Sequence, residues 1–247
     1  MLSDTQPVSA VDRALVVLAA LARQGTALTA AELVSKTGLS QSTLYRQLAT
    51  LKRWGFVLEA QGRYAPGPLS LQLAVGFDMA SHLVQQARAD MAALAQQSQE
   101  SVGLIVALNG QAICVDMIES RQALRCSFEK GRSVPLQRGA SAKCLLAHLP
   151  EGALSEAYRN APESGLSPQP ELLAELSAIR KAGLAVSDGE VDPGVWGVSA
   201  PLFKGRKHAV GVLTLMAPSV RVQGKHSPLI QMTVLTAARI SRNLSSQ

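Results

Sequence analysis

The chain has 247 residues, 47% of them hydrophobic and 17% charged, which is the composition of a globular protein with one large domain or two smaller ones. Its formal net charge of +6 allows an anionic partner without naming one. The sequence contains no apolar run of about 18 residues and no basic start followed by an apolar stretch, so we expect no contact with a membrane, no secretory signal and a cytoplasmic location.

The first 38 residues carry the start and stop signals of two short helices. Ser9, followed by an acidic first turn, predicts an N-cap, and Gly25 predicts the end of that helix. Apolar residues recur between them at helical spacing, at Val11, Leu15, Leu18 and Leu21. The sequence TAAE from Thr29 matches a capping box, and Gly38 predicts that the second helix ends near Thr37.

A third helix and a hairpin follow directly. Ser40 caps a helix in the sequence LSQSTLYRQLATLKRWGF, whose predicted buried stripe is Leu44, Leu48 and Leu51. The sequence FVLEAQGRYAP then reads as two short strands around a turn at 60–62, closed by Pro66. Three helices followed by a β-hairpin are the layout of a winged helix-turn-helix.

The face of the third helix opposite its leucines is polar and basic. Small residues at its start would let it enter a major groove, where Gln41 could pair with adenine and Arg46 with guanine. Hydroxyl and basic groups nearby could bind bases or phosphates, and Arg63 lies at the tip of the wing. The predicted DNA-binding residues are Ser40, Gln41, Ser42, Thr43, Tyr45, Arg46, Lys52 and Arg63.

Each of these residues could also be an ordinary capping or solvated group. The charge of the segment 21–66 favours the DNA interpretation, because six basic residues stand against two acidic ones, a net charge of +4. The capped helix pair, its four-residue turn, the basic helix and the wing together predict binding to double-stranded DNA, with an affinity that falls as salt rises.

The remainder of the chain predicts an α+β domain with an antiparallel sheet. A long Ala-, Gln- and Leu-rich helix is expected after Pro66, with a break near Gly76. Asn109-Gly110 predicts a hairpin between two apolar runs, and WGVSAPLF and HAVGVLTLMAP predict another strand pair joined by the loop KGRK. Further helices are predicted at 141–149, 152–159, 170–181 and 227–244. We therefore expect a DNA-binding domain at 1–66, a linker helix at 67–80 and a second domain at 81–247.

Several segments of the chain resemble the IclR-type transcriptional regulators. They are VDRALVVLAAL, AAELVSKTGLSQSTLYRQLATLKRWGFV, YAPGPLSLQLA, VDMIES, VPLQRGASAKCLLAHLP, IRKAGLAVSDGEVDPGVWGVSAPLF and AARIS. The resemblance implies a winged helix-turn-helix, a linker helix and a GAF-like effector-binding domain. It also implies homodimers or dimers of dimers that repress or activate transcription from a DNA operator on sensing a small metabolite.

The resemblance also implies a set of effector-binding residues. Val195, Trp196 and Val198 would form an apolar wall and Ser199 would supply a hydroxyl, although Trp196 could instead be an ordinary core residue. Some family members carry a polar residue near Gly197, and this chain does not. The full implied set is Asp116, Ile118, Gly139, Ala140, Ser141, Asp188, Glu190, Val195, Trp196, Val198 and Ser199. For Asp188 and Glu190 the alternative is a solvated loop.

The segment RGASAKCLLA suggests the charge of the effector. Gly139 and Ala140 precede a helix that Ser141 or its neighbour would open, and the first N–H groups of a helix have no partner within it. Small side chains there would let a carboxylate approach. We therefore expect a small organic acid with an apolar or aromatic body, bound through its carboxylate at Gly139 and Ala140, unless these residues serve only as a turn and a cap.

Two other functional classes compete with a regulator. Cys144 and His148 lie at i and i+4 of one predicted helix and could mimic a metal pair or a thiol–imidazole dyad of a metabolite-binding enzyme. The three cysteines, Cys114, Cys126 and Cys144, show no spacing typical of zinc sites or disulfide frameworks. A GAF-like interaction module without DNA binding would leave the basic helix and wing unexplained. We predict no catalytic residue, no metal and no cofactor.

Overall fold

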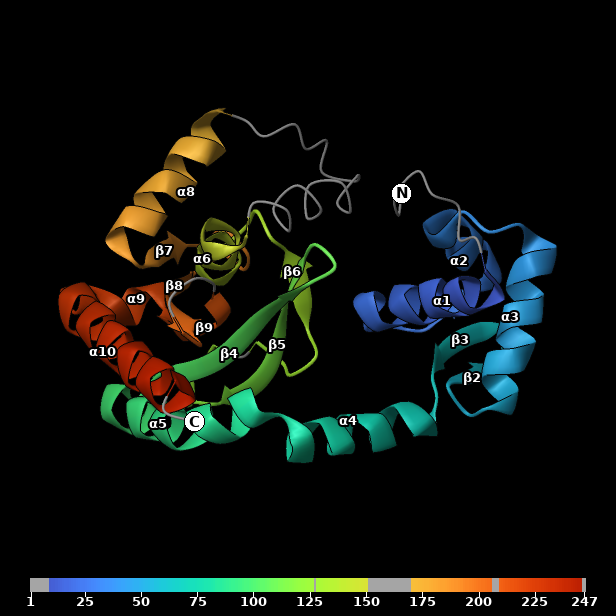
Figure 1. Ribbon diagram of the computed structural model, residues 1–247, viewed down its shortest axis with the longest axis horizontal. Helices are drawn as coiled ribbons and strands as arrows, with labels where there is room; N and C mark the ends of the chain where they lie inside the picture. The colour runs from blue at the N-terminus through green and yellow to red at the C-terminus, as the bar shows by residue number, and fades with distance from the viewer. Residues whose placement is uncertain (1–8, 127, 151–169, 206–208, 246–247) are drawn as a thin grey trace. The chain divides into compact units, whose positions relative to one another are not determined.

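The computed structural model describes residues 9–126, 128–150, 170–205 and 209–245. They form two compact units divided between Ser81 and His82, and each unit is described by itself (Figure 1). Within the described ranges, no helix has both the length and the apolar character that crossing a membrane requires.

The first unit consists of helices and a small antiparallel sheet. Its elements are α1 (Ala10–Gln24), β1 (Leu28–Thr29), α2 (Ala30–Thr37), α3 (Gln41–Arg53), β2 (Val57–Ala60), β3 (Arg63–Pro66) and α4 (Pro68–Ala80). The strands lie in the order β1, β3, β2. This arrangement confirms the predicted winged helix-turn-helix, with β2 and β3 as the wing.

The helix boundaries agree with the capping residues in the sequence. Ser9 and Thr29 each form both hydrogen bonds of a capping box, and the Ser40 hydroxyl accepts the Thr43 N–H. Gly25 and Gly38 end α1 and α2 in the left-handed conformation, with φ of 66° and 68°. These positions are the ones at which the predicted helices start and stop.

The core of the first unit lies between the three helices and β3. The predicted stripe of α3 is buried, and it packs with apolar residues of α1 and α2: Val17, Leu21, Leu33, Leu44, Leu48 and Leu51. Strand β1 was not predicted. It pairs with β3 through Leu28 and Tyr64, and two residues are too few to show an alternating pattern.

Helix α4 is continuous through Gly76, so the predicted break there is wrong. One glycine costs a helix only about 1 kcal/mol relative to alanine, and α4 ends instead at its C-cap, Ser81. The start of α4 is held against the segment between α3 and β2: Gly67 N–H donates to Phe56 O at 2.7 Å, and any side chain at Gly67 would collide with Gly55, since a Cβ there would lie 2.3 Å from Gly55 O.

The second unit contains a six-stranded antiparallel sheet, as the α+β prediction required. Its strands are β4 (Ser101–Leu108), β5 (Gln111–Ile118), β6 (Ser133–Pro135), β7 (Ala185–Asp188), β8 (Val195–Phe203) and β9 (Ala209–Pro218). They lie in the order β6, β5, β4, β9, β8, β7. The predicted hairpin turn is present, with φ of 51° at Asn109 and 74° at Gly110. Strands β6 and β7 are short and were not predicted.

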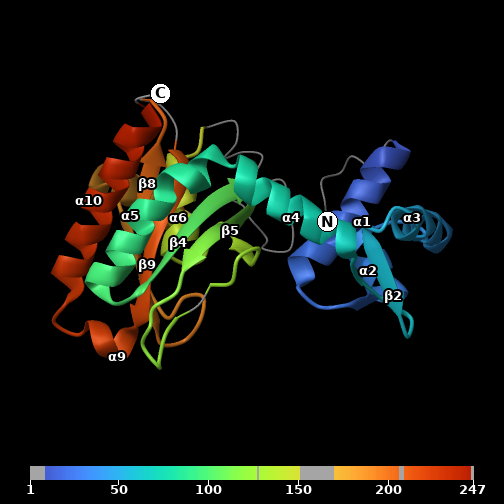
Figure 2. The same cartoon turned by 90° about the horizontal axis from the view of Figure 1, so that it is seen from below.

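Helices cover both faces of this sheet (Figures 1 and 2). Helices α5 (His82–Ser98) and α10 (His226–Ser245) cover one face, and α6 (Ala140–His148) and α8 (Pro170–Ala182) lie on the other. A short helix, α9 (Ser219–Val222), follows β9. The predicted helix at 152–159 and most of the KGRK loop lie outside the described residues.

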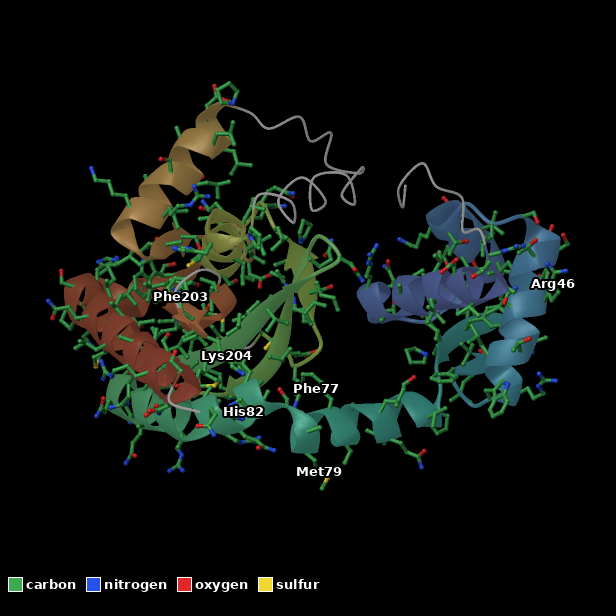
Figure 3. All side chains as sticks on the ribbon, in the orientation of Figure 1. Arg46, Phe77, Met79, His82, Phe203 and Lys204 are labelled. Carbon is green, nitrogen blue, oxygen red and sulfur yellow. The ribbon has the colours of Figure 1, made fainter. Side chains whose placement is uncertain are left out.

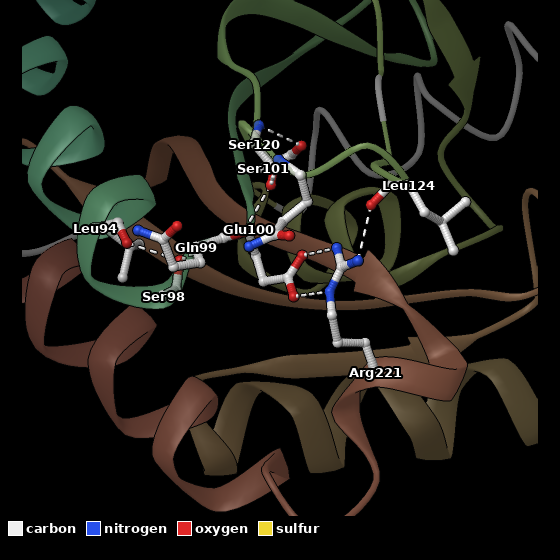
Figure 4. Close-up of polar contacts among 9 residues, drawn as sticks. Leu94, Ser98, Gln99, Glu100, Ser101, Ser120, Leu124 and Arg221 are labelled. Atoms are coloured by element: carbon white, nitrogen blue, oxygen red, sulfur yellow. Dashed lines mark hydrogen bonds and ion pairs between the residues drawn. The ribbon is translucent and has the colours of Figure 1, made fainter.

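A buried ion pair fixes the ends of several elements (Figure 4). Glu100, between α5 and β4, is 5% exposed, and its two carboxylate oxygens accept from Nε and Nη2 of Arg221, each at 2.6 Å. Arg221 also donates through Nη1 to Leu124 O at 2.8 Å. The pair therefore joins α9, the start of β4 and the segment that follows β5.

Candidate functional site

The first candidate site is the exposed face of α3. Gln41, Ser42, Tyr45 and Arg46 are exposed there, while the leucines of the opposite face are buried. Arg46 projects outward from the helix (Figure 3). Within the described part of the chain, the side chains of Gln41 and Arg46 take part in no recorded hydrogen bond or ion pair. Both side chains are therefore available to an outside partner.

The hydroxyl groups at the start of α3 bind one another. Ser40 Oγ donates to Thr43 Oγ1 at 2.9 Å, and Ser42 Oγ lies 3.3 Å from Ser40 Oγ. Ser40 therefore acts as the cap of the helix. The hydroxyl of Thr43 is engaged within the unit, whereas Ser42 is exposed.

Lys52 and Arg63 have partners inside the first unit. The Lys52 ammonium group pairs with the Glu59 carboxylate on β2, and this hydrogen bond raises the pKa of Lys52. Arg63 donates to Ala27 O at 3.1 Å and lies 4.0 Å from the Glu32 carboxylate. Both cations are exposed, and both are held beside the helix-turn-helix by these contacts.

The second candidate site is a hollow between the sheet and the start of α6, with about 470 Å³ of empty space, part of it open to solvent. Its lining is largely apolar, from Phe128, Val134, Val191, Val195 and Met216. Four polar side chains also line it: Ser141, Ser187, Asp192 and Thr214. An apolar pocket with a few polar groups is the usual form of a small-molecule site.

Four of the predicted effector residues line this pocket: Gly139, Ala140, Ser141 and Val195. Ser199 lies on the same side of β8 as Val195, and its buried hydroxyl is 2.7 Å from Thr214 Oγ1, so it reaches the lining through Thr214. The prediction that Trp196 and Val198 join Val195 in one wall is wrong. Successive residues of a strand point to opposite faces, and both side chains lie in the core under α5 and α10.

Trp196 is therefore a core residue, and its ring packs edge-on to His226 with ring centroids 5.4 Å apart. Asp116 and Ile118 also lie on the α5 side, so their predicted place in the pocket is wrong. Asp116 pairs across the sheet with Leu104, which faces that side, and its carboxylate is 3.8 Å from Arg88 Nη1 of α5.

Asp188 and Glu190 do not line the pocket, although both were predicted to bind the effector. Asp188 accepts from Ser219 Oγ at 2.5 Å, at the edge of the sheet. Glu190 binds the protein itself: one carboxylate oxygen accepts Gly139 N–H at 3.0 Å and the other accepts Lys143 Nζ at 2.7 Å.

The start of α6 differs from the prediction in its hydrogen bonding. The N-cap is Gly139, with φ of 86° and no side-chain cap. Its N–H is engaged by Glu190, and Ala140 N–H donates to Ser187 Oγ at 2.9 Å. The two N–H groups expected to receive a ligand carboxylate are thus occupied. The next two, of Ser141 and Ala142, have no hydrogen-bond partner within the described ranges.

Most of the other residues that line the pocket were not predicted from the sequence. Ser187 faces the pocket because β7 pairs with β8, which places it beside Gly197. Asp192 pairs with Arg132 at 3.0 Å, and the Arg132 guanidinium lies over the Phe128 ring at 4.9 Å. Only the pairing of short strands and loops distant in sequence reveals these positions.

The geometry does not support a nucleophilic dyad. His148 Nδ1 lies 2.8 Å from the Cys144 backbone oxygen rather than from its thiol. Burial raises the pKa of the Cys144 thiol to about 12 and lowers the pKa of His148. The thiol is therefore protonated near neutral pH. Among the described residues, no group of three or more His, Cys, Asp or Glu side chains could hold a metal ion.

Two protein-family models together match almost the whole chain. Residues 10–59 match the IclR helix-turn-helix domain, and residues 79–242 match the C-terminal domain of the bacterial transcriptional regulator IclR.

Related proteins are similar over nearly their full length. The HTH-type transcriptional regulator KipR of Bacillus subtilis is 30% identical over 225 residues, which are 88% of this chain and 90% of KipR. The crystal structure of an IclR transcriptional regulator from Alicyclobacillus acidocaldarius has a TM-score of 0.76 at 24% identity, covering 95% of this chain and 98% of the other. An IclR homologue from Microbacterium hydrocarbonoxydans, solved with 4-hydroxybenzoate, has a TM-score of 0.71 at 20% identity, covering 97% and 100%.

Proposed function

Because the chain belongs to the IclR family of bacterial transcriptional regulators, we propose that α3 reads an operator through Gln41, Tyr45 and Arg46 and that the pocket beside α6 binds the effector. Membership makes the chain a DNA-binding regulator with an effector-binding domain, a class of proteins without enzymatic activity. We assign residues 1–66 to DNA binding, 67–80 to a linker helix, and 81–247 to effector binding and oligomerisation. The exposed side chains of Gln41 and Arg46, which have no hydrogen-bond or ion-pair partner within the described residues, support the first assignment.

We also propose that the regulator binds DNA as a homodimer. Helix α4 buries none of its residues in this chain, and five of its large apolar side chains are 46–75% exposed: Leu71, Leu73, Val75, Phe77 and Met79. Phe77 and Met79 project from different sides of the helix (Figure 3). Exposed apolar surface of this kind typically marks an interface, and a second copy of the chain is the partner that a symmetric regulator needs.

A dimer predicts two protected half-sites on DNA. Two α3 helices related by two-fold symmetry would occupy half-sites about one helical turn apart, roughly 34 Å centre to centre. Footprinting of the DNA upstream of the protein's own gene should therefore show a symmetric pair at every protein concentration that protects DNA. A single asymmetric half-site at all concentrations would contradict the dimer.

For the effector we propose a small organic acid with an apolar or aromatic body. Phe128, Val191 and Met216 support the apolar body, and the N–H group of the lining residue Ser141 suits a carboxylate at the start of α6. The homologue solved with 4-hydroxybenzoate supports the same class of ligand. A dimer of dimers, and either repression or activation, are compatible with this proposal.

Acids should bind the full-length protein at least about tenfold tighter than their neutral amides, because only the acid carries the charge that the helix N-terminus favours. Titration calorimetry with matched pairs, beginning with 4-hydroxybenzoate and 4-hydroxybenzamide, measures this difference. Ala140→Leu should abolish binding by filling the pocket, while Ala182→Leu at the exposed end of α8 should not. Equal binding of acids and amides, or normal binding by Ala140→Leu, would place the effector elsewhere.

A further inference from the structure

Lys143 is a buried cation in α6, a helix of mostly apolar residues. It is 5% exposed and lies one turn inside α6. Its Nζ donates to Glu175 Oε1 of α8 at 2.5 Å and to Glu190 Oε1 at 2.7 Å. Burial lowers the pKa of Lys143, but the hydrogen bonds that Lys143 donates to Glu175 and Glu190 outweigh burial and raise the pKa above its ordinary value. Lys143 is therefore charged at neutral pH, and its charge is balanced by carboxylates from two separate segments.

Glu190 connects Lys143 to the pocket. Its second carboxylate oxygen accepts the N–H of Gly139, the N-cap of α6, so one side chain joins Lys143 to the start of the helix. The next two residues, Val191 and Asp192, line the pocket. The segment 189–194 packs closely against the start of α6. Val191 leaves no room for a side chain at Gly139, since a Cβ added there would lie 2.6 Å from Val191 Cγ2.

We propose that Lys143 is a positioning residue of the pocket, which holds Glu190 on the start of α6 and thereby fixes the wall formed by the segment 189–194. This role rests on the proposed effector function of the pocket. Without the Lys143 charge, the Glu190 carboxylate would be left partly buried beside Glu175 with no cation bound to it, because the contact that Arg138 makes with Glu190 is to the backbone oxygen, at 2.7 Å. An uncompensated carboxylate moves toward water, and Val191 and Asp192 would move with it.

Hydrogen–deuterium exchange on the full-length protein, without ligand, tests this role. Lys143→Met should speed exchange of the segment 186–194 by about tenfold or more and leave peptides of β9 unchanged. The matched control is Lys181→Met, which removes an exposed lysine from the last turn of α8. This variant should change exchange neither in the segment 186–194 nor in β9.

The double variant Lys143→Met, Glu190→Gln distinguishes the effect of an unpaired Glu190 charge from the effect of changed packing at position 143. The amide that Glu190→Gln introduces carries no charge and its oxygen can still accept Gly139 N–H, so exchange should return to within about threefold of the wild type. Unchanged exchange in Lys143→Met, or equal mobility in the single and double variants, would overturn the proposal. If Lys143→Met does not fold, Glu190→Ala alone decides, because alanine removes the acceptors of both Gly139 N–H and Lys143 Nζ. Exchange of 186–194 at the wild-type level would equally overturn the proposal, and a rise confined to that segment would support it.

A binding measurement distinguishes this proposal from the function on which it rests. Lys143→Met should weaken 4-hydroxybenzoate binding by about tenfold or more if that acid binds the wild type. Failure of every acid to bind the wild type would count against the proposed effector class. The exchange result would still decide the role of Lys143.

Discussion

Arg221→Ala should lower the free energy of unfolding of the second unit by about 3 kcal/mol, near the lower end of the range for breaking a buried ion pair. The lost partner is Glu100, whose side chain is 6% exposed and would remain as a buried charge without a cation. Arg221 itself keeps 25% of its side chain exposed, which moderates the loss. The bond to Leu124 O would be lost as well.

Urea unfolding of the full-length protein measures this effect. Trp196 fluorescence reports on the second unit once Trp54 of the first unit is replaced by phenylalanine, a substitution at an exposed side chain. Lys225→Ala, at an exposed position just after α9, is the matched control and should change stability by less than about 0.5 kcal/mol. Adding Glu100→Gln to Arg221→Ala should recover part of the loss, because the unpaired charge is then gone. A loss below about 1 kcal/mol would show that the pair is not a main support of the unit.

Arg46→Ala should weaken binding to the specific operator by about 1–3 kcal/mol, roughly fivefold to 150-fold. The reason is that the exposed Arg46 guanidinium, which has no recorded partner within the described residues, has the geometry to bind a guanine through two hydrogen bonds. Nonspecific DNA should be affected less. Arg53→Ala in the last turn of α3 is the control, and there we expect a uniform loss across sequences, as for a phosphate contact.

Elements with local signals were predictable from the sequence. The N-cap at Ser9, the capping box at Thr29, the stops at Gly25 and Gly38, and the hairpin at Asn109-Gly110 all depend on residues within four positions of one another. The structure confirms each of them. Strand β1 was not predictable in this way, because it forms only by pairing with β3. The unbroken course of α4 was not predictable either, because the cost of Gly76 in a helix is small enough for the rest of the helix to offset.

The pocket depended on contacts that the sequence does not display. Adjacent residues Val195 and Trp196 were placed in one wall, although a strand must send them to opposite faces. Gly139 N–H was expected to await a ligand, but Glu190, 51 residues away, occupies it. Ser187 and Asp192 line the pocket only because β7 and the loop after it fold back onto β8. The sequence therefore predicted where α6 begins, but not that protein side chains would bind the N–H groups of Gly139 and Ala140.

The most direct test of DNA reading by α3 compares wild type and Arg46→Ala on a panel of single base-pair variants of the footprinted operator. The account predicts that wild type discriminates at each contacted position and that Arg46→Ala loses discrimination at one base pair in each half-site, with the other positions unchanged. Weakening of all sequences to the same extent, with discrimination intact at every position, would show that Arg46 contacts only phosphate and would contradict the assignment of this residue to base recognition.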